Sequence, residues 1–318
     1  MFARILIAYS LLLPMGGWCT PNANLPAPPT GYSVLQNSIP HGAVTASRSY
    51  PTRNAGNRLF TIYLPPGYST ATKYPVLYLL HGIGGNEVSW IGQGSNEGTA
   101  QHVMEFLYSR TLAQPMIVVM PYGNMVNTTG DTWQNFEDVL KNDLVPYIQA
   151  NYSASTNPNQ RGLAGLSMGG GQTLNFGFKN YTFFTWIGEF SCAPNTIAAA
   201  TTIPNPTAIT QNVHLSWFSV GASDGLKNNT DNYHNFFDQN NITPHVYQVE
   251  PAPLAHEKEV WNRSLYNFAQ RIFMNQTPVI RPIRERAAVF SRPELILGRF
   301  SLNGRKKAVF PLSASVRP

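Results

Sequence analysis

Short apolar segments alternate with helical patterns along most of this chain, and no other feature limits its possible folds as strongly. Several of these segments are almost continuously apolar, which parallel strands require because helices cover both faces of their sheet. Apolar residues also recur at helical spacing in residues 136–147 and 260–273. The alternation predicts an α/β fold in which a mostly parallel central sheet has helices on both faces. The expected strands are residues 58–65, 74–81, 115–122, 163–166, 186–192, 215–221 and 245–250.

The ends of the chain differ in composition from this central part. Residues 1–19 combine a basic start with a short apolar run, which is typical of a secretory signal peptide and too short to cross a bilayer. The alternative is a buried N-terminal strand or helix. We expect residues 20–41 to be a Pro/Asn-rich linker and lead-in, residues 42–273 the folded domain, and residues 274–318 a basic tail. The protein is then expected to be secreted, extracellular or periplasmic, without stable membrane insertion.

The two cysteines predict no disulfide. Cys19 lies at the end of the predicted signal peptide, so Cys192 would be left without a partner. A secreted domain of this size can fold without a disulfide. Cys192 is interpreted as a small buried residue that fills the core rather than as a nucleophile.

The positive charge of the chain is concentrated in its last residues. The formal net charge is +6, but residues 274–318 hold nine basic and two acidic residues, a balance of +7, so the rest sums to −1. A nucleic-acid partner is therefore not expected for the folded domain. The tail is interpreted as a flexible segment that binds anionic surfaces. The alternative is a strand pair turning at Asn303–Gly304, which weakly resembles the sorting tails of some secreted bacterial enzymes.

A candidate nucleophile lies between an expected strand and an expected helix. Residues 165–169, Gly-Leu-Ser-Met-Gly, match the pattern G-x-S-x-G around Ser167. The pattern alone is weak, but the strand before it and the glycine-rich helix start after it are the setting of a nucleophile elbow. Side chains at Gly165 and Gly169 would collide with neighbouring backbone in such a turn. The alternative is an ordinary glycine-rich turn between a strand and a helix.

Chain order selects the acid that would assist this serine. In the α/β-hydrolase fold the order is Ser, then Asp or Glu, then His. Asp224 directly follows the expected strand 215–221, so it lies at a carboxyl end, where ligands of such sheets bind. Asp231 and Asp238 fall in an expected surface helix. Asp224 is the candidate acid, and its alternative role is that of a turn or helix-capping aspartate.

Chain order and position after a strand also select the base. His256 follows the expected strand 245–250 by a short loop and precedes the last helix. His245 opens that strand and should lie at the opposite edge of the sheet, and His234 lies on the surface helix. His256 is therefore expected to take the proton of Ser167, although it could also be a capping or surface histidine.

An early glycine-rich turn supplies candidate oxyanion donors. His81-Gly82-Ile83-Gly84-Gly85 follows the expected strand 74–81, where the second donor of this fold is expected. The candidate donors are the backbone N–H groups of Ile83 and Met168. His81 itself is interpreted as structural, because it precedes the serine. The chain contains no H-E-x-x-H, cysteine pair, EF-hand loop or phosphate loop, so neither a metal site nor a cofactor is expected.

Several motifs in order resemble a known family. They are YPVLYLLHGIGGNEVSW, FEDVLKNDLVPYIQANYS, LAGLSMGGGQTLN, GEFSCAPN and VWNRSLYNFAQRIF. Together, across residues 42–273, they resemble the esterase D / feruloyl esterase family, and they are most similar to the feruloyl esterase domains of bacterial xylanases. One departure lies at residues 254–258, Leu-Ala-His-Glu-Lys, where related chains often have Gly before the histidine and an acidic–Trp pair after it.

The resemblance implies an activity and a substrate. It implies that a serine carboxylesterase hydrolyses feruloyl and related hydroxycinnamoyl esters on plant arabinoxylan through an acyl-enzyme, without a cofactor. It carries the catalytic roles to Ser167, Asp224 and His256. The same fold allows an acetyl-xylan esterase or an acyltransferase, and a non-catalytic polysaccharide-binding module is the alternative from another class. Trp90 and Trp133 follow strand ends and are candidates to line an aromatic acyl pocket, or else they pack over the core.

Overall fold

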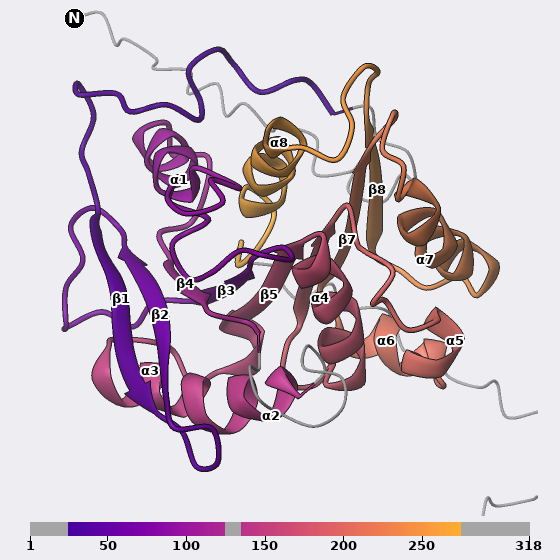
Figure 1. Ribbon diagram of the computed structural model, residues 1–318, viewed down its shortest axis with the longest axis horizontal. Coiled ribbons are helices and arrows are strands. Elements are labelled where there is room, and N and C mark those ends of the chain that lie inside the picture. Colours follow the sequence, from indigo (N-terminus) through magenta and orange to yellow (C-terminus); the bar gives the residue numbers. More distant parts are fainter. Residues whose placement is uncertain (1–24, 125–134, 275–318) are drawn as a thin grey trace, which may run out of the picture. The chain divides into compact units, whose positions relative to one another are not determined.

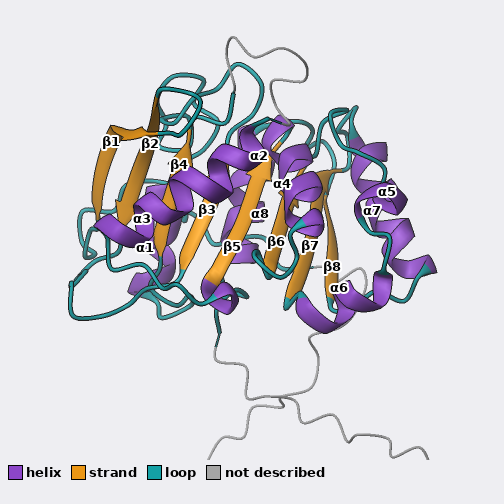
Figure 2. Ribbon diagram, turned by 90° about the horizontal axis from the view of Figure 1, so that it is seen from below, coloured by secondary structure: helices purple, strands orange, loops and turns teal. Residues whose placement is uncertain are grey.

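The structure is a computed structural model that describes residues 25–124 and 135–274, and in this part an eight-stranded sheet runs through the centre (Figures 1 and 2). The strand order is β1-β2-β4-β3-β5-β6-β7-β8. β2 pairs antiparallel with β1 and β4, and all other neighbours are parallel. The strands are β1 (Ala43–Pro51), β2 (Asn57–Leu64), β3 (Val76–Leu80), β4 (Ile117–Pro121), β5 (Arg161–Leu166), β6 (Trp186–Phe190), β7 (Leu215–Gly221) and β8 (His245–Glu250).

Helices cover both faces of the sheet, and strand periodicity explains how (Figure 2). Along β3, Leu77 and Leu79 pack against α1 (Ala100–Ser109) and α8 (Lys258–Ala269), whereas Tyr78 and Leu80 face the opposite layer. Because both faces of β3 are buried, the strand is apolar along its whole length. The opposite layer contains α2 (Phe136–Val139), the π-helical turn η1 (Leu140–Leu144), α3 (Val145–Asn151), α4 (Met168–Lys179) and α7 (Lys227–Gln239). Shorter elements are the 3₁₀ turn η2 (Pro158–Gln160), α5 (Ala199–Thr202) and α6 (Pro206–Asn212).

The predicted fold class is confirmed, and each of the seven expected strands corresponds to one of β2 to β8. The sequence pattern missed β1, which lies at the sheet edge and is mostly exposed. Its pairing with β2 is interrupted between Thr45 and Arg48. An exposed, irregular edge strand needs no apolar periodicity, so it leaves no pattern to detect.

Several expectations concern residues outside the described part, among them the signal peptide, Cys19, Trp133 and nearly all of the basic tail. Within the described residues, no helix combines the length and apolarity that crossing a membrane would need. Cys192 is fully buried, in agreement with a role in the core.

Candidate active site

Ser167 lies on a strained turn between β5 and α4. Its backbone is at φ +51° and ψ −116°, a conformation that residues with a side chain rarely adopt. Two glycines allow the turn to close. A Cβ at Gly165 would lie 2.5 Å from the carbonyl oxygen of Gly169, and one at Gly169 would lie 2.6 Å from that of His81. The turn therefore places the serine at the carboxyl end of β5 and directly before the N-terminus of α4.

Ser167, His256 and Asp224 form one hydrogen-bonded chain. Nε2 of His256 lies 2.9 Å from Oγ of Ser167, and Nδ1 lies 2.9 Å from Oδ2 of Asp224. Asp224 follows β7, and His256 follows β8, so all three come from carboxyl ends of parallel strands in one sheet, with β6 between β5 and β7. The ring of His256 also packs edge-to-face on Trp261 of α8, with centroids 5.2 Å apart. In this arrangement Nε2 is directed at the serine hydroxyl.

Backbone contacts hold the loops of Asp224 and His256 together. The N–H of Ser223 donates to the carbonyl of Leu254 at 2.9 Å. At the end of β7, a Cβ on Gly221 would lie 2.6 Å from the carbonyl oxygens of both Leu254 and Ala255. A side chain at position 221 would therefore collide with the segment before His256, and glycine allows this segment to pack against the end of β7.

The surroundings of Asp224 favour its ionised form. Burial of its side chain by itself raises the pKa, but hydrogen bonds from the His256 ring and the Leu226 backbone outweigh this effect and lower it overall. The side chain is 0% exposed, whereas that of His256 is 29% exposed. A buried carboxylate that accepts from Nδ1–H keeps Nε2 of the neutral imidazole free to accept a proton.

The glycine-rich turn of residues 81–85 lies beside Ser167. A Cβ on Gly82 would be 3.4 Å from Cβ of Ser167. The backbone N–H of Gly82 donates to Oε2 of Glu97 at 2.9 Å, which holds the turn in place. Glu97 is buried, and burial raises its pKa. No sequence motif pointed to Glu97, because it lies in the long connection between β3 and α1 and reaches the turn only in the folded chain.

His81 is structural in the geometry as well. Its Nδ1 donates to the carbonyl of Gly82 at 2.7 Å, and its Nε2 accepts the N–H of Gly123 at 2.9 Å. Burial lowers the pKa of His81 to about 4, so the ring is neutral at pH 7. It joins the turn after β3 to the chain after β4 and has no contact with the hydroxyl of Ser167.

Trp90 does not line a pocket, which corrects one of the expectations for the acyl site. It is 1% exposed, donates from Nε1 to the carbonyl of Leu80 at 3.0 Å, and packs edge-to-face on Phe190. Its ring lies so close to Gly98 that a Cβ there would be 2.2 Å from it. A large aromatic ring after a strand end can equally cover the core, and that alternative is the one observed. Trp133 lies outside the described residues.

A second buried carboxyl lies behind the site, on β6. Glu189 is 0% exposed, and its Oε2 accepts the N–H of Cys192 at 2.9 Å. Burial raises the pKa of Glu189 to about 8. At neutral pH the group is therefore mainly protonated, and it does not compete with Asp224 as the negative partner of His256.

The raised pKa of Glu189 predicts how stability depends on pH. The folded state binds the proton of Glu189 more tightly than the unfolded state does, where the pKa is near 4.5. The contribution of this proton to folding stability is therefore fully present below pH 4.5 and is lost as pH rises to about 8. Urea unfolding at several pH values measures this effect. Between pH 4.5 and about 8, the free energy of unfolding of the wild type should fall by up to about 5 kcal/mol relative to that of Glu189→Gln. The control Glu259→Gln, at a helical position whose side chain is 38% exposed, should follow the wild type. Parallel curves for wild type and Glu189→Gln would contradict the assignment.

The chain matches the model of the Esterase family, described as "Putative esterase", over residues 53–266. It is 29% identical to an endo-1,4-beta-xylanase/feruloyl esterase of Xylanibacter ruminicola over 78% of this chain and 34% of the relative. It is 32% identical to endo-1,4-beta-xylanase Y of Acetivibrio thermocellus over 42% of this chain and 13% of the relative. The chain thus spans about a third or less of the length of these relatives.

Solved structures share the fold. A ferulic acid esterase of Anaeromyces mucronatus superposes with a TM-score of 0.67 at 22% identity, covering 78% of this chain and 96% of its own. The feruloyl esterase module of Clostridium thermocellum, solved with sinapinate, gives 0.67 at 21% identity, covering 82% and 98%. An S-formylglutathione hydrolase of Staphylococcus aureus gives 0.53 at 18% identity, covering 71% and 97%. With a serine elbow in an α/β-hydrolase fold and a family match over more than half of its length, this chain belongs to the Esterase family.

Proposed function

We propose that this protein is a secreted serine carboxylesterase that hydrolyses hydroxycinnamoyl esters, feruloyl esters above all, on plant arabinoxylan. The observation that carries the proposal is the chain of 2.9 Å contacts from Ser167 through His256 to Asp224. It joins a nucleophile, a base and an orienting carboxylate in a chain of the Esterase family.

In the first half of the reaction, Oγ of Ser167 attacks the ester carbonyl carbon. His256 accepts the hydroxyl proton on Nε2, and the ionised Asp224 stabilises the imidazolium that forms. We assign the oxyanion donors to the backbone N–H groups of Ile83 and Met168, on the turn beside Ser167 and at the start of α4. His256 then protonates the sugar oxygen, the tetrahedral intermediate collapses, and the alcohol leaves an acyl group on Ser167.

In the second half, water replaces the sugar alcohol. His256 removes a proton from the water, which attacks the acyl carbonyl, and the same two N–H groups bind the oxyanion again. Return of the proton from His256 to Oγ of Ser167 releases the free carboxylic acid. The cycle needs no cofactor because each proton moves between Ser167, His256, the substrate and water.

The substrate class is supported by the relatives and by one feature of the site. The two relatives described above are named as xylanases, one of them also as a feruloyl esterase, and the similar solved structures include complexes with ferulic acid and sinapinate. Ile83 exposes 65% of its surface on the turn beside Ser167, which offers an apolar contact for an acyl group. Trp133 remains the proposed aromatic contact for that group. Secretion is proposed from the composition of residues 1–19.

A comparison of acyl groups tests the proposed substrate. We expect kcat/KM for methyl ferulate and methyl p-coumarate to exceed that for the matching acetyl ester by at least about tenfold, since an aromatic ring adds apolar contact area. Initial rates with the three esters, and release of ferulate from feruloylated arabinoxylan, provide the measurement. Equal or faster hydrolysis of the acetyl ester would favour an acetyl-xylan esterase. Transfer of the acyl group to an added sugar in preference to water would favour an acyltransferase.

A further inference from the structure

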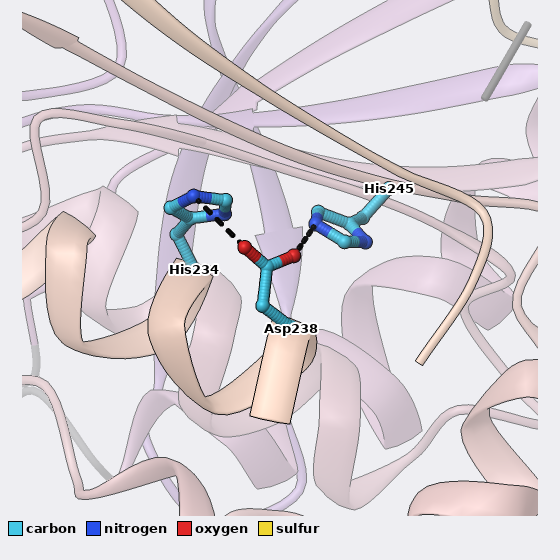
Figure 3. A group of neighbouring side chains, drawn as sticks. All are labelled: His234, Asp238 and His245. Atoms are coloured by element: carbon cyan, nitrogen blue, oxygen red, sulfur yellow. Dashed lines mark ion pairs between the residues drawn. The ribbon is translucent and has the colours of Figure 1, made fainter. Parts of the chain in front are cut away.

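Two histidines and an aspartate meet where α7 ends and β8 begins (Figure 3). His234 and Asp238 are four residues apart on α7 and therefore share one face of the helix. His245 is the first residue of β8. Nε2 of His234 lies 3.4 Å from Oδ2 of Asp238, and Nε2 of His245 lies 3.1 Å from Oδ1. The two imidazoles thus flank a single carboxylate.

The ring of His245 is oriented so that Nε2, the nitrogen without a hydrogen, faces the cluster. Its Nδ1 lies 2.8 Å from the carbonyl oxygen of Ile242, and a carbonyl only accepts, so Nδ1 carries the hydrogen. In the neutral ring Nε2 is then an acceptor that faces the carboxylate of Asp238, another acceptor. The side chain is 3% exposed, and among the described residues its Nε2 finds no hydrogen-bond partner of acceptable geometry. A backbone carbonyl that fixes the second nitrogen is the usual support of a metal-binding histidine.

The ring of His234 is also held in place, by stacking on an aromatic side chain of β8. It stacks on Tyr247 with centroids 4.0 Å apart and the two planes 3° from parallel. The hydroxyl of Tyr247 donates to Asp231 and accepts from Lys227, so the stacking surface is itself anchored. Asp238 is 45% exposed and leaves the cluster open to solvent on one side.

We infer that His234, Asp238 and His245 bind one divalent transition-metal ion of the zinc type, with water completing its coordination. One ligand atom from each residue lies within 4.8 Å of the others, and small side-chain shifts bring such atoms onto an ion with bonds of about 2.1 Å. Two imidazoles and a carboxylate suit zinc or nickel, whereas magnesium and calcium prefer oxygen ligands alone. The C-terminal end of α7 adds carbonyl groups whose negative dipole end favours a cation.

The inferred ion is structural, because the cluster lies at the opposite edge of the sheet from Ser167. His245 begins β8, whereas His256 follows its other end after Glu250. The six residues of β8 span about 17 Å, at roughly 3.3 Å per residue. An ion at this position would cross-link the last turn of α7 to the start of β8. Its expected consequence is a gain in stability, without a part in the ester chemistry.

Zinc binding can be measured on the full chain, prepared without a histidine tag and stripped of metal. In titration calorimetry with zinc chloride at pH 7.5, we expect one site. Asp238→Asn should weaken its affinity at least about tenfold, while the control Asp138→Asn, the same change at an exposed helical aspartate, leaves it unchanged. At free zinc one hundred times its dissociation constant, the melting temperature should rise by about 5–10 °C. Magnesium and calcium at the same concentration should cause no rise.

The inference is overturned if the wild-type chain binds no zinc, or if Asp238→Asn binds it as tightly as the wild type does. Circular dichroism and the metal-free melting temperature establish whether each variant is folded. Should Asp238→Asn fail that check, His234→Gln provides the second variant, and it too must lose zinc affinity. Unchanged zinc affinity in a folded His234→Gln variant would equally contradict the site.

Discussion

Replacing Ser167 with alanine should reduce kcat for methyl ferulate by about a million-fold, the scale of a lost nucleophile in a serine hydrolase. The loss is expected in kcat because the hydroxyl forms the bond to the acyl group, whereas the substrate-binding surface is kept. Alanine also removes only one oxygen, so melting temperature should stay close to that of the wild type. Steady-state rates and thermal unfolding of purified protein measure the two effects.

The control for this variant is Ser223→Ala. Ser223 lies in the loop of Asp224, is exposed, and contacts the loop of His256 through its backbone N–H only. Its turnover should remain within a few-fold of the wild type. If a folded Ser167→Ala protein retained more than a small fraction of wild-type turnover, Ser167 would not be the nucleophile.

Replacing Asp224 with asparagine should lower kcat by about ten-thousand-fold and change KM little. Asparagine is nearly isosteric, but its amide can donate to Nδ1 of His256 and stabilise the tautomer whose Nε2 carries a hydrogen. That nitrogen then cannot accept the proton of Ser167. Asparagine also removes the buried negative charge that stabilises the imidazolium. Initial rates over a range of ester concentrations separate the effect on kcat from that on KM.

Asp231→Asn tests the choice of acid. Asp231 follows Ser167 in the chain as Asp224 does, but its carboxylate contacts Lys227 of α7 and Tyr247 of β8. We expect this variant to keep nearly full turnover. Nearly full turnover in Asp224→Asn combined with a large loss in Asp231→Asn would show that the acid was assigned to the wrong strand end.

The sheet could be predicted because parallel strands buried on both faces are mostly continuous apolar runs. β3 and β4 are buried at every position and were evident from composition alone. β1 followed no such rule, since its side chains face solvent at the sheet edge. Helix α1 was also not identified, although Val103, Phe106 and Leu107 are buried in the core.

The catalytic candidates could be located because chain order and strand ends are features of a sequence. A residue directly after a parallel strand, such as Asp224, has to lie at the carboxyl edge of the sheet. Glu97 and the cluster of His234, Asp238 and His245 had no comparable pattern. These residues lie close to their partners only after a loop or a helix has folded back on a strand. For Trp90, the sequence placed the residue near a strand end but could not determine whether its ring faces the core or the substrate.

The acyl-enzyme on Ser167 can be tested by peptide mapping. The protein is mixed with a feruloyl ester of a good leaving group, the reaction is quenched with acid, and the peptides are analysed by mass spectrometry. We expect one feruloyl group on the peptide that contains Ser167, formed in a burst equal to the protein concentration and absent from Ser167→Ala. Ester hydrolysis by the wild type with no acyl group trapped, or with the acyl group on another residue, would contradict it.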